Sequence, residues 1–245
     1  MTSLKSTLLL AAAVLVWGAT PAHAQRKTKI KTKGEATTAP ADPASRLLPL
    51  FGGLTPAQAE KVVGTAFLTD IERSFASRAE ASRFFSTKGY EYLIENQADT
   101  AQYRFNLAWL LDQKNPEAYR GLGIIASQKS TPEASIALLS QGLAIDPKNA
   151  NLLSDLGASY LIVYQQSKKK KDLTTAATYL EQAVALNTAN ADTWQQMARV
   201  YFYQEKYPQA WEAIHKGQQI NVGSLDFELI SELQAKLPDP AGQFK

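Results

Sequence analysis

The chain has 245 residues, of which 45% are hydrophobic, and it contains no cysteine; this length allows one or two domains with a sizeable core. Without cysteine it has no disulfide framework, thiolate nucleophile, Cys-ligated zinc or cysteine-linked lipid anchor. The formal net charge is +3, yet from Leu47 onward acidic residues outnumber basic ones by 21 to 19, which argues against a nucleic-acid-binding body.

Residues 1–24 have the layout of a cleavable secretory signal. Lys5 is the only charged residue before a basic segment, residues 8–16 form an apolar run of nine, and an Ala-His-Ala triplet ends at Ala24. Nine helical residues cover roughly 14 Å, about half of a bilayer's hydrocarbon core, which disfavours the alternative of an uncleaved anchor. The pattern predicts cleavage after Ala24, no transmembrane segment in the mature chain, and export to the periplasm, with secretion as the alternative.

Residues 25–46 predict a flexible basic linker that ends in Ala and Pro. Lysines alternate with threonines and then give way to Ala, Pro and Asp, and such a segment buries too little apolar surface to offset the entropy of ordering it. Two interpretations remain open: a solvated linker, or a basic arm that makes weak contact with anionic envelope polymers or lipid headgroups.

The region 47–81 predicts an N-terminal capping element. Thr55 to Ala76 reads as one helix, in which Thr55 is the N-cap and Pro56 lies in the first turn.

An internal repeat then fills most of the chain. A period of 34 residues relates Phe85, Tyr119 and Leu153, and the same register resumes at Trp194 after seven extra residues around Gln165 to Lys171. One position always holds a small residue, which lets paired helices approach closely, and large side chains fill the space between helices. The repeat units are 82–115, 116–149, 150–190 with the insertion, and 191–222, and their small residues are Gly89, Gly123, Gly157 and Ala198.

This register resembles that of the tetratricopeptide repeat family over about Ser82 to Val222. The resemblance implies antiparallel helix pairs stacked into a right-handed superhelix, with a concave inner face that binds a protein or peptide. The block Arg104 to Gly123 also resembles a stretch of small exported repeat proteins of Gram-negative bacteria, which implies a periplasmic setting and no defined activity.

Residues 223–245 predict a C-terminal capping helix and tail. Ser224 to Leu237 is amphipathic, with Phe227, Ile230 and Leu233 on the apolar face together with Leu237, and Pro238 ends the helix. A repeat array needs such terminal elements with a polar outer side. The predicted fold is therefore all-α: a right-handed superhelical solenoid of about four helix pairs with capping helices at both ends.

The inner face of each first helix is the predicted binding surface, because repeat packing makes no demand on it. Mixed aromatic, aliphatic and Arg side chains suit peptide recognition, although each could equally be an ordinary surface residue. Some family members clamp two carboxylates there, but the corresponding first-repeat positions hold Ser86 and Tyr90. We expect Arg120, Arg199, Phe202 and Tyr203 to share one contact surface. The full candidate set is Tyr90, Arg120, Ile124, Asp155, Arg199, Phe202 and Tyr203.

Two further features carry weaker hypotheses. Lys168 to Lys171 in the insertion is either a solvated helix end or a docking patch for an anionic partner. If the inner face is the binding surface, neutralising these lysines should mainly change salt dependence and on-rate. His215, the only histidine after Ala24, is expected to be an exposed residue of an outer helix without a metal or base role.

No enzyme motif appears in the sequence, which lacks HExxH, GxSxG and a phosphate-binding glycine loop. We therefore expect no catalysis, cofactor or metal, and a scaffold that binds a protein or peptide in its groove. The alternatives are a structural subunit that self-associates through its caps or outer face, and an unrecognised hydrolase or transferase.

Overall fold

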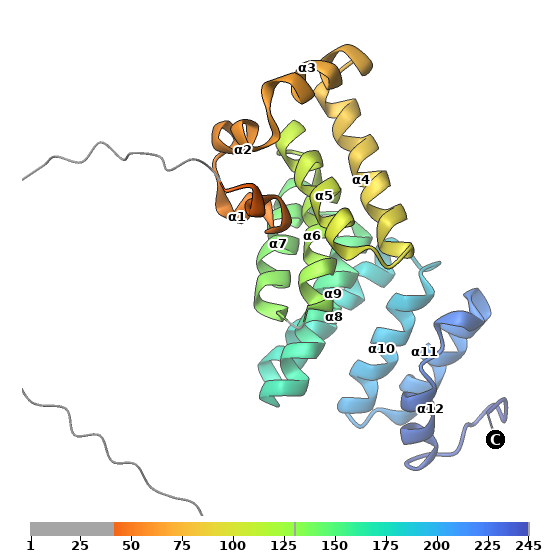
Figure 1. Ribbon diagram of the computed structural model, residues 1–245. Coiled ribbons are helices and arrows are strands. Elements are labelled where there is room, and N and C mark those ends of the chain that lie inside the picture. Colours follow the sequence, from red (N-terminus) through yellow and green to blue (C-terminus); the bar gives the residue numbers. More distant parts are fainter. Residues whose placement is uncertain (1–41, 130, 245) are drawn as a thin grey trace, which may run out of the picture. The chain divides into compact units, whose positions relative to one another are not determined.

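The computed structural model describes residues 42–129 and 131–244 (Figure 1). The predicted signal and residues 25–41 of the predicted linker lie outside these residues. The described chain is helical and contains no strand, so the predicted all-α solenoid is confirmed.

Consecutive helices form antiparallel pairs, and the pairs stack (Figure 1). Each second helix also contacts the first helix of the following pair, while α4 contacts α6, α6 contacts α8, and α8 contacts α10. The first helices therefore form one face. The pairs are α4 (Arg78–Ile94) with α5 (Ala98–Leu111), α6 (Pro116–Gln128) with α7 (Pro132–Ile145), α8 (Ala150–Ser167) with α9 (Lys170–Leu186), and α10 (Ala191–Tyr203) with α11 (Tyr207–Ile220).

Asparagines define where three of the first helices begin. The side chains of Asn115, Asn149 and Asn190 accept hydrogen bonds from backbone N–H groups in the first turns of α6, α8 and α10. Such an N-cap stabilises a helix by about 1 kcal/mol. Asn115 also donates to Ser82 Oγ at 2.8 Å and to Ser86 Oγ at 2.9 Å, so it ties α6 to the preceding pair.

Glycines allow close approach inside the pairs. A Cβ atom on Gly157 would lie 2.4 Å from Leu180 Cγ, and one on Gly123 would lie 2.7 Å from Leu139 Cγ. These distances are far below van der Waals contact, so the partner leucines occupy the space that a side chain would need.

The N-terminal cap consists of two helices, and the prediction of one helix from Thr55 to Ala76 is wrong. α2 (Pro56–Val63) and α3 (Thr65–Ser74) are separated by Gly64, whose φ of 97° lies in a region that L side chains rarely adopt. Thr55 does cap α2, through a reciprocal capping box with Gln58.

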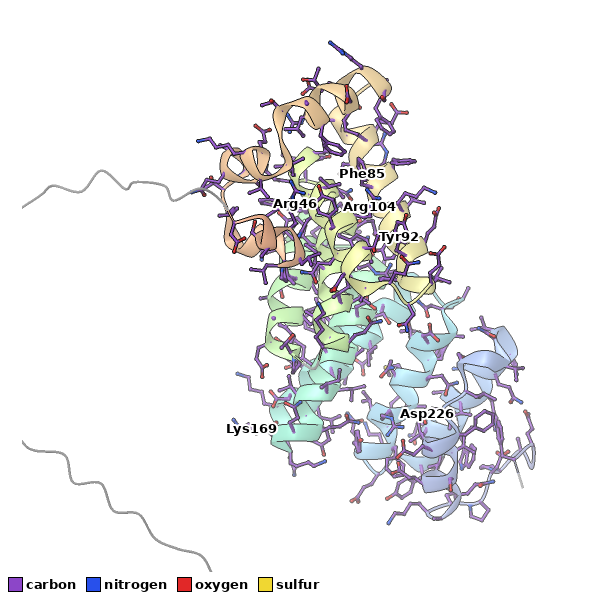
Figure 2. The ribbon with its side chains drawn as sticks, in the orientation of Figure 1. Arg46, Phe85, Tyr92, Arg104, Lys169 and Asp226 are labelled. Atoms are coloured by element: carbon purple, nitrogen blue, oxygen red, sulfur yellow. The ribbon has the colours of Figure 1, made fainter. Side chains whose placement is uncertain are left out.

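The segment before α2 is anchored to the first repeat. It comprises η1 (Pro43–Leu47) and the short left-handed turn α1 (Leu50–Gly53). Asn106 Nδ2 donates to the carbonyls of Arg46 at 2.9 Å and Leu48 at 2.8 Å, and Arg46 lies beside α5 (Figure 2). Phe51 is fully buried although its φ is 54°. The left-handed conformation costs roughly 1–2 kcal/mol for each of the two non-glycine residues Leu50 and Phe51, and burial of the Phe side chain offsets much of this with about 1.5–3 kcal/mol.

The insertion lengthens both helices of the third pair, so α8 runs on to Ser167 and Lys168 closes it in a left-handed conformation with φ 55°. Lys169 protrudes from the end of this pair (Figure 2).

The C-terminal cap comprises η2 (Val222–Ser224) and α12 (Phe227–Gln234). α12 ends before the predicted stop at Pro238. The placement of Phe227 on its buried face is wrong, because Phe227 is 68% exposed, whereas Leu229 is fully buried. Asp226 caps the helix, which begins at Phe227 and not at the predicted Ser224, and Leu229 lies in the core beside Ile230 and Leu233.

Candidate functional site

The seven predicted binding residues lie on the first helices, but the structure gathers them into separate groups. Tyr90, Arg120 and Asp155 come from α4, α6 and α8, and Arg120 contacts both of the others. Phe202 and Tyr203 lie at the end of α10. Within the described residues, no hydrogen bond or ion pair joins Arg120 to Arg199 or to Tyr203.

The first group is a polar network that spans three repeats. Arg120 Nε lies 2.7 Å from Asp155 Oδ2, and its Nη1 lies 3.3 Å from Tyr90 Oη. Tyr90 Oη donates to Glu117 Oε2 at 2.6 Å, and Asn149 Nδ2 donates to Glu117 Oε1 at 3.3 Å. The Arg120 guanidinium also lies 5.4 Å from the centre of the Tyr90 ring. These charge-assisted contacts connect α4 to α6 and α6 to α8.

Burial shapes the electrostatics of this network. It raises the pKa of Tyr90, an effect that the Arg120 charge opposes and Glu117 adds to. Burial also raises the pKa of Asp155, again against the pull of Arg120. The side chains of Arg120 and Asp155 are only 20% and 26% exposed. Arg120 therefore already directs donors at Asp155 and Tyr90, and a ligand would meet a compensated charge.

Ile124, the fourth member of this part of the face, lines a small cavity. The cavity measures about 200 Å³, below the roughly 300–1,000 Å³ of small-molecule sites. It can take a single side chain of a partner. The lining residues are Ile124, Ser127, Gln128, Ser135, Leu139, Asp155, Ala158 and Ser159.

Arg199 connects the last repeat to the C-terminal cap. Its Nη2 is paired with Asp226, the N-cap of α12, and its Nη1 lies 3.9 Å from Glu232. The Arg199 side chain is 15% exposed. Burial would raise the pKa of Asp226, but hydrogen bonds from Arg199 and from the Leu229 backbone outweigh it and hold the pKa below its usual value. Arg199 therefore connects α10 to the C-terminal cap.

Tyr203 belongs to a second cluster that the insertion completes. Its ring centre lies 5.1 Å from that of Tyr164 on α8, and Gln165 Nε2 donates to its hydroxyl at 2.9 Å. The Lys168 ammonium lies 5.8 Å from the Tyr164 ring centre and 6.0 Å from that of Tyr203. We call Tyr164, Lys168, Lys170 and Tyr203 the tyrosine–lysine corner.

A cavity of about 510 Å³ opens at this corner. It lies between the ends of α8 and α10 and the starts of α9 and α11. Phe202 packs beside it, 5.8 Å from Tyr203 between ring centres. The lining residues are Tyr164, Lys170, Leu173, Thr174, Tyr203, Gln204, Glu205 and Lys206.

Sequence reasoning treated the inner face and the lysine insertion as separate surfaces, and it missed Tyr164. The structure joins them, because the insertion extends α8 until Tyr164 and Lys168 reach the end of α10. The available signal was the spacing of Tyr164 and Lys168, four residues apart and therefore on one helix face.

The predicted exposure of His215 is wrong. Its ring packs against both Trp211 and Phe244, at 5.9 Å and 6.0 Å between ring centres, and its Nε2 lies 3.1 Å from Asp239 Oδ1. The C-terminal tail folds back over α11, where its Asp239 and Phe244 contact His215. Within residues 42–129 and 131–244 no cluster of three or more His, Asp or Glu could hold a metal, and no helix is long and apolar enough to cross a membrane.

No protein-family model and no curated protein matches this chain. Solved structures do match. TTC0263, a thermophilic TPR protein of Thermus thermophilus, aligns at 18% identity and a TM-score of 0.56 over 64% of this chain and 83% of its own. MamA of Desulfovibrio magneticus RS-1 aligns at 15% and 0.51, over 66% and 89%. The Cut9–Hcn1 assembly of APC/C aligns at 19% and 0.54, over 74% and 34%. At these identities the likeness extends to the fold, and the described chain is a tetratricopeptide-repeat solenoid.

Proposed function

We propose that this protein is a non-catalytic scaffold that binds a protein or peptide segment on the face formed by its first helices. The observation that carries this proposal is the continuous stack of α4, α6, α8 and α10, of which the network around Arg120 ties the first three together. A face fixed before binding loses little entropy when a partner docks. At its far end Phe202 and Tyr203 remain half-buried, and aromatic residues of this kind are frequent anchors in interfaces.

Site-specific photo-crosslinking in the native envelope tests this proposal. A photoreactive amino acid replaces Phe202 on the first-helix face or, as the matched control, Gln141, which is exposed on the second helix α7. Cross-linked proteins are identified by mass spectrometry, and the same pair is then rebuilt from purified components. We expect a defined adduct from position 202 and none from position 141. Adducts from position 141 alone would contradict binding on the first-helix face.

A second candidate is a structural subunit that self-associates through its caps. Apolar side chains are exposed near both ends: Ile94 is 87% exposed where α4 ends, and Phe227 is 68% exposed on α12. Sedimentation velocity over a range of concentrations separates the two functions. A monomer at all concentrations supports the scaffold, whereas concentration-dependent assembly that Phe227→Ser abolishes supports the structural subunit.

We also propose that the protein works in the cell envelope, in the periplasm or, alternatively, after secretion. The support is the signal pattern of residues 1–24, since the similar solved structures bear on the fold alone. Mass determination of the exported protein provides the test. An N-terminus at Gln25 is expected, and an N-terminus at Met1 with tight membrane retention would exclude cleavage.

A further inference from the structure

The tyrosine–lysine corner combines a concentration of positive charge with aromatic walls. Lys168 and Lys170 belong to it. Lys169 and Lys171 are their neighbours in sequence, and Lys206 lines the same cavity of about 510 Å³ as Lys170. All five lysines are exposed. In the described part of the chain, none of these lysines forms an ion pair with a carboxylate, whereas Asp172 accepts a hydrogen bond from Ser167 Oγ at 2.6 Å. The corner therefore presents several cations that are not held in ion pairs, with Glu205, Glu133 and Asp172 as the acidic residues of the adjoining linings.

The ammonium group of Lys168 is held near the cavity by the aromatic rings. It lies within about 6 Å of two ring centres, the range in which the negative faces of aromatic rings attract cations. Its N–H donors are still available to an incoming carboxylate, because the ring faces accept no directed hydrogen bond that would saturate them. A cation restrained in this way loses less side-chain entropy on pairing than a free surface lysine does.

We propose that the tyrosine–lysine corner binds an acidic segment of a partner protein, in which carboxylates flank an aromatic or aliphatic side chain. This inference rests on the scaffold function proposed above and names the chemistry of the partner. The apolar side chain of that segment enters the cavity of about 510 Å³ that Tyr164 and Tyr203 line. The flanking carboxylates pair with Lys168 and Lys170 at its edge.

Charge and shape together favour a peptide as the occupant. Glu205 belongs to the cavity lining and would repel a densely charged polyanion, but it leaves room for a segment whose charges are spaced by apolar residues. The tyrosine walls and Leu173 supply apolar contact that a headgroup or a free anion would not use. Burial of that contact gives affinity, and the lysines give charge selection and speed of association.

The test uses short fluorescein-labelled peptides with the mature protein at low and high salt, read by fluorescence anisotropy. Three probes have the same length and alternate Glu with Phe, Gln with Phe, or Lys with Phe. The corner variant is Lys168→Gln with Lys170→Gln. The matched control, Lys148→Gln with Lys216→Gln, removes the same charge elsewhere; Lys216 also lies over an aromatic ring, 4.6 Å from the centre of Trp194.

We expect the Glu–Phe peptide to bind most tightly and to lose affinity as salt is added. The corner variant should weaken its binding at least about tenfold, while the control variant should leave it unchanged. Tyr203→Leu, which keeps apolar volume but removes the ring, should weaken the Glu–Phe and Gln–Phe peptides alike. Circular dichroism of each variant confirms that the fold is intact.

Several results would overturn the inference, and they differ from failure of the scaffold function. Equal binding of the Glu–Phe and Gln–Phe peptides, or equal loss in the control variant, removes the specific role of the lysines. Binding that survives in the corner variant but is lost in Ile124→Asp leaves the scaffold function standing and moves the site to the centre of the face. Preference for phosphatidylglycerol vesicles, or self-association lost in the corner variant, assigns the corner to a membrane or a second copy. If no peptide binds, the corner proposal fails, and the crosslinking experiment at position 202 decides the scaffold function independently.

Discussion

The Tyr90–Arg120–Asp155 network and the tyrosine–lysine corner use the same pair of groups in opposite ways. In both, a cation lies against a tyrosine ring, at 5.4 Å for Arg120 and at 5.8 Å and 6.0 Å for Lys168. Arg120 also meets Asp155 from the next repeat and Glu117 from its own helix. Lys168 meets no carboxylate in the described chain. The neighbouring carboxylates, and not the aromatic–cation pair itself, decide whether the cation is held in a structural ion pair or is available to a ligand.

This difference follows from where each cluster lies in the array. Interior positions of the stack have a neighbouring repeat on both sides, which can supply a compensating charge. The corner is built from an insertion, whose consecutive lysines extend beyond the regular contact between α8 and α10. The network is therefore expected to contribute to stability and the corner to binding, and four measurements test that division.

The largest effect is expected from Gly157→Leu, close to Asp155 on α8. A Cβ atom there would lie 2.4 Å from Leu180 Cγ and 3.2 Å from the Ala176 carbonyl oxygen, so α8 and α9 must separate. Overpacking of this kind costs about 3 kcal/mol at the upper end of its usual range. Each repeat buries its apolar face only against its neighbours, so the body from about Leu47 to Leu237 should unfold in a single transition. The variant should shift the midpoint of that transition to a lower urea concentration.

Ala158→Leu is the matched control, because it adds the same side chain at the next position, which lines the cavity of about 200 Å³. It should cost clearly less than Gly157→Leu. Equal costs would show that the close approach of α8 and α9 at Gly157 is not the limiting contact.

A smaller effect, about 2 kcal/mol at neutral pH, is expected from Arg120→Ala, which leaves a half-buried Asp155 without its cation. Burial already raises the pKa of Asp155, and loss of Arg120 should raise that pKa further. A carboxyl with a raised folded-state pKa binds its proton more tightly when folded, so its charged form costs stability as pH rises. The deficit of Arg120→Ala relative to the parent should therefore shrink at mildly acidic pH.

The double variant Arg120→Ala with Asp155→Asn makes this test more specific. It removes the charge that the single variant strands, so it should recover much of the lost stability at neutral pH and show little change of its deficit with pH. If Arg120→Ala is as stable as the parent at neutral pH, the network does not stabilise the fold. Arg120 would then again be a candidate for donating hydrogen bonds to a ligand.

Arg199→Ala is expected to cost about 1 kcal/mol by loosening α12, since one partner of a partly exposed ion pair is lost. From the sequence alone, Arg199 was expected to belong to the contact surface that it shares with Arg120, Phe202 and Tyr203. Because the pKa of Asp226 is held low in the folded protein, this pair stabilises above the unfolded pKa of Asp226 and the stability is lost as pH falls through its folded pKa. Hydrogen exchange of α12 amides should report the loosening, with α6 amides as the internal control.

The smallest effect on stability is expected in the corner. Lys168→Gln with Lys170→Gln should change the free energy of unfolding by no more than about 0.5 kcal/mol, because both residues are exposed and neither has an ion-pair partner in the described chain. A larger loss would mean that the lysines hold the ends of α8 and α9 together. The corner would then resemble the network, and the contrast between the two regions would disappear.

Much of the solenoid could be predicted from the sequence, because its signals are local and periodic. The 34-residue spacing of Phe85 and Tyr119 and the small residue four positions after each specify which side of a helix meets its partner. Asparagine and proline at helix starts are also local signals, since capping involves atoms only two or three residues apart. Where a helix breaks was harder to predict. Gly64 ends α2 through its backbone conformation, and the same residue type lies inside helices at Gly89 and Gly157.

Only the tertiary structure decided which predicted binding residues remain available. Arg120 and Arg199 looked equivalent in sequence, but their partners Asp155 and Asp226 lie 35 and 27 residues away, and no local pattern marks such pairs. Asn106 holds the carbonyls of Arg46 and Leu48 across a still longer separation. The physical reason is that charge compensation depends on distances of a few ångströms in space. Stacking sets those distances, whereas helical periodicity records only which residues face inward.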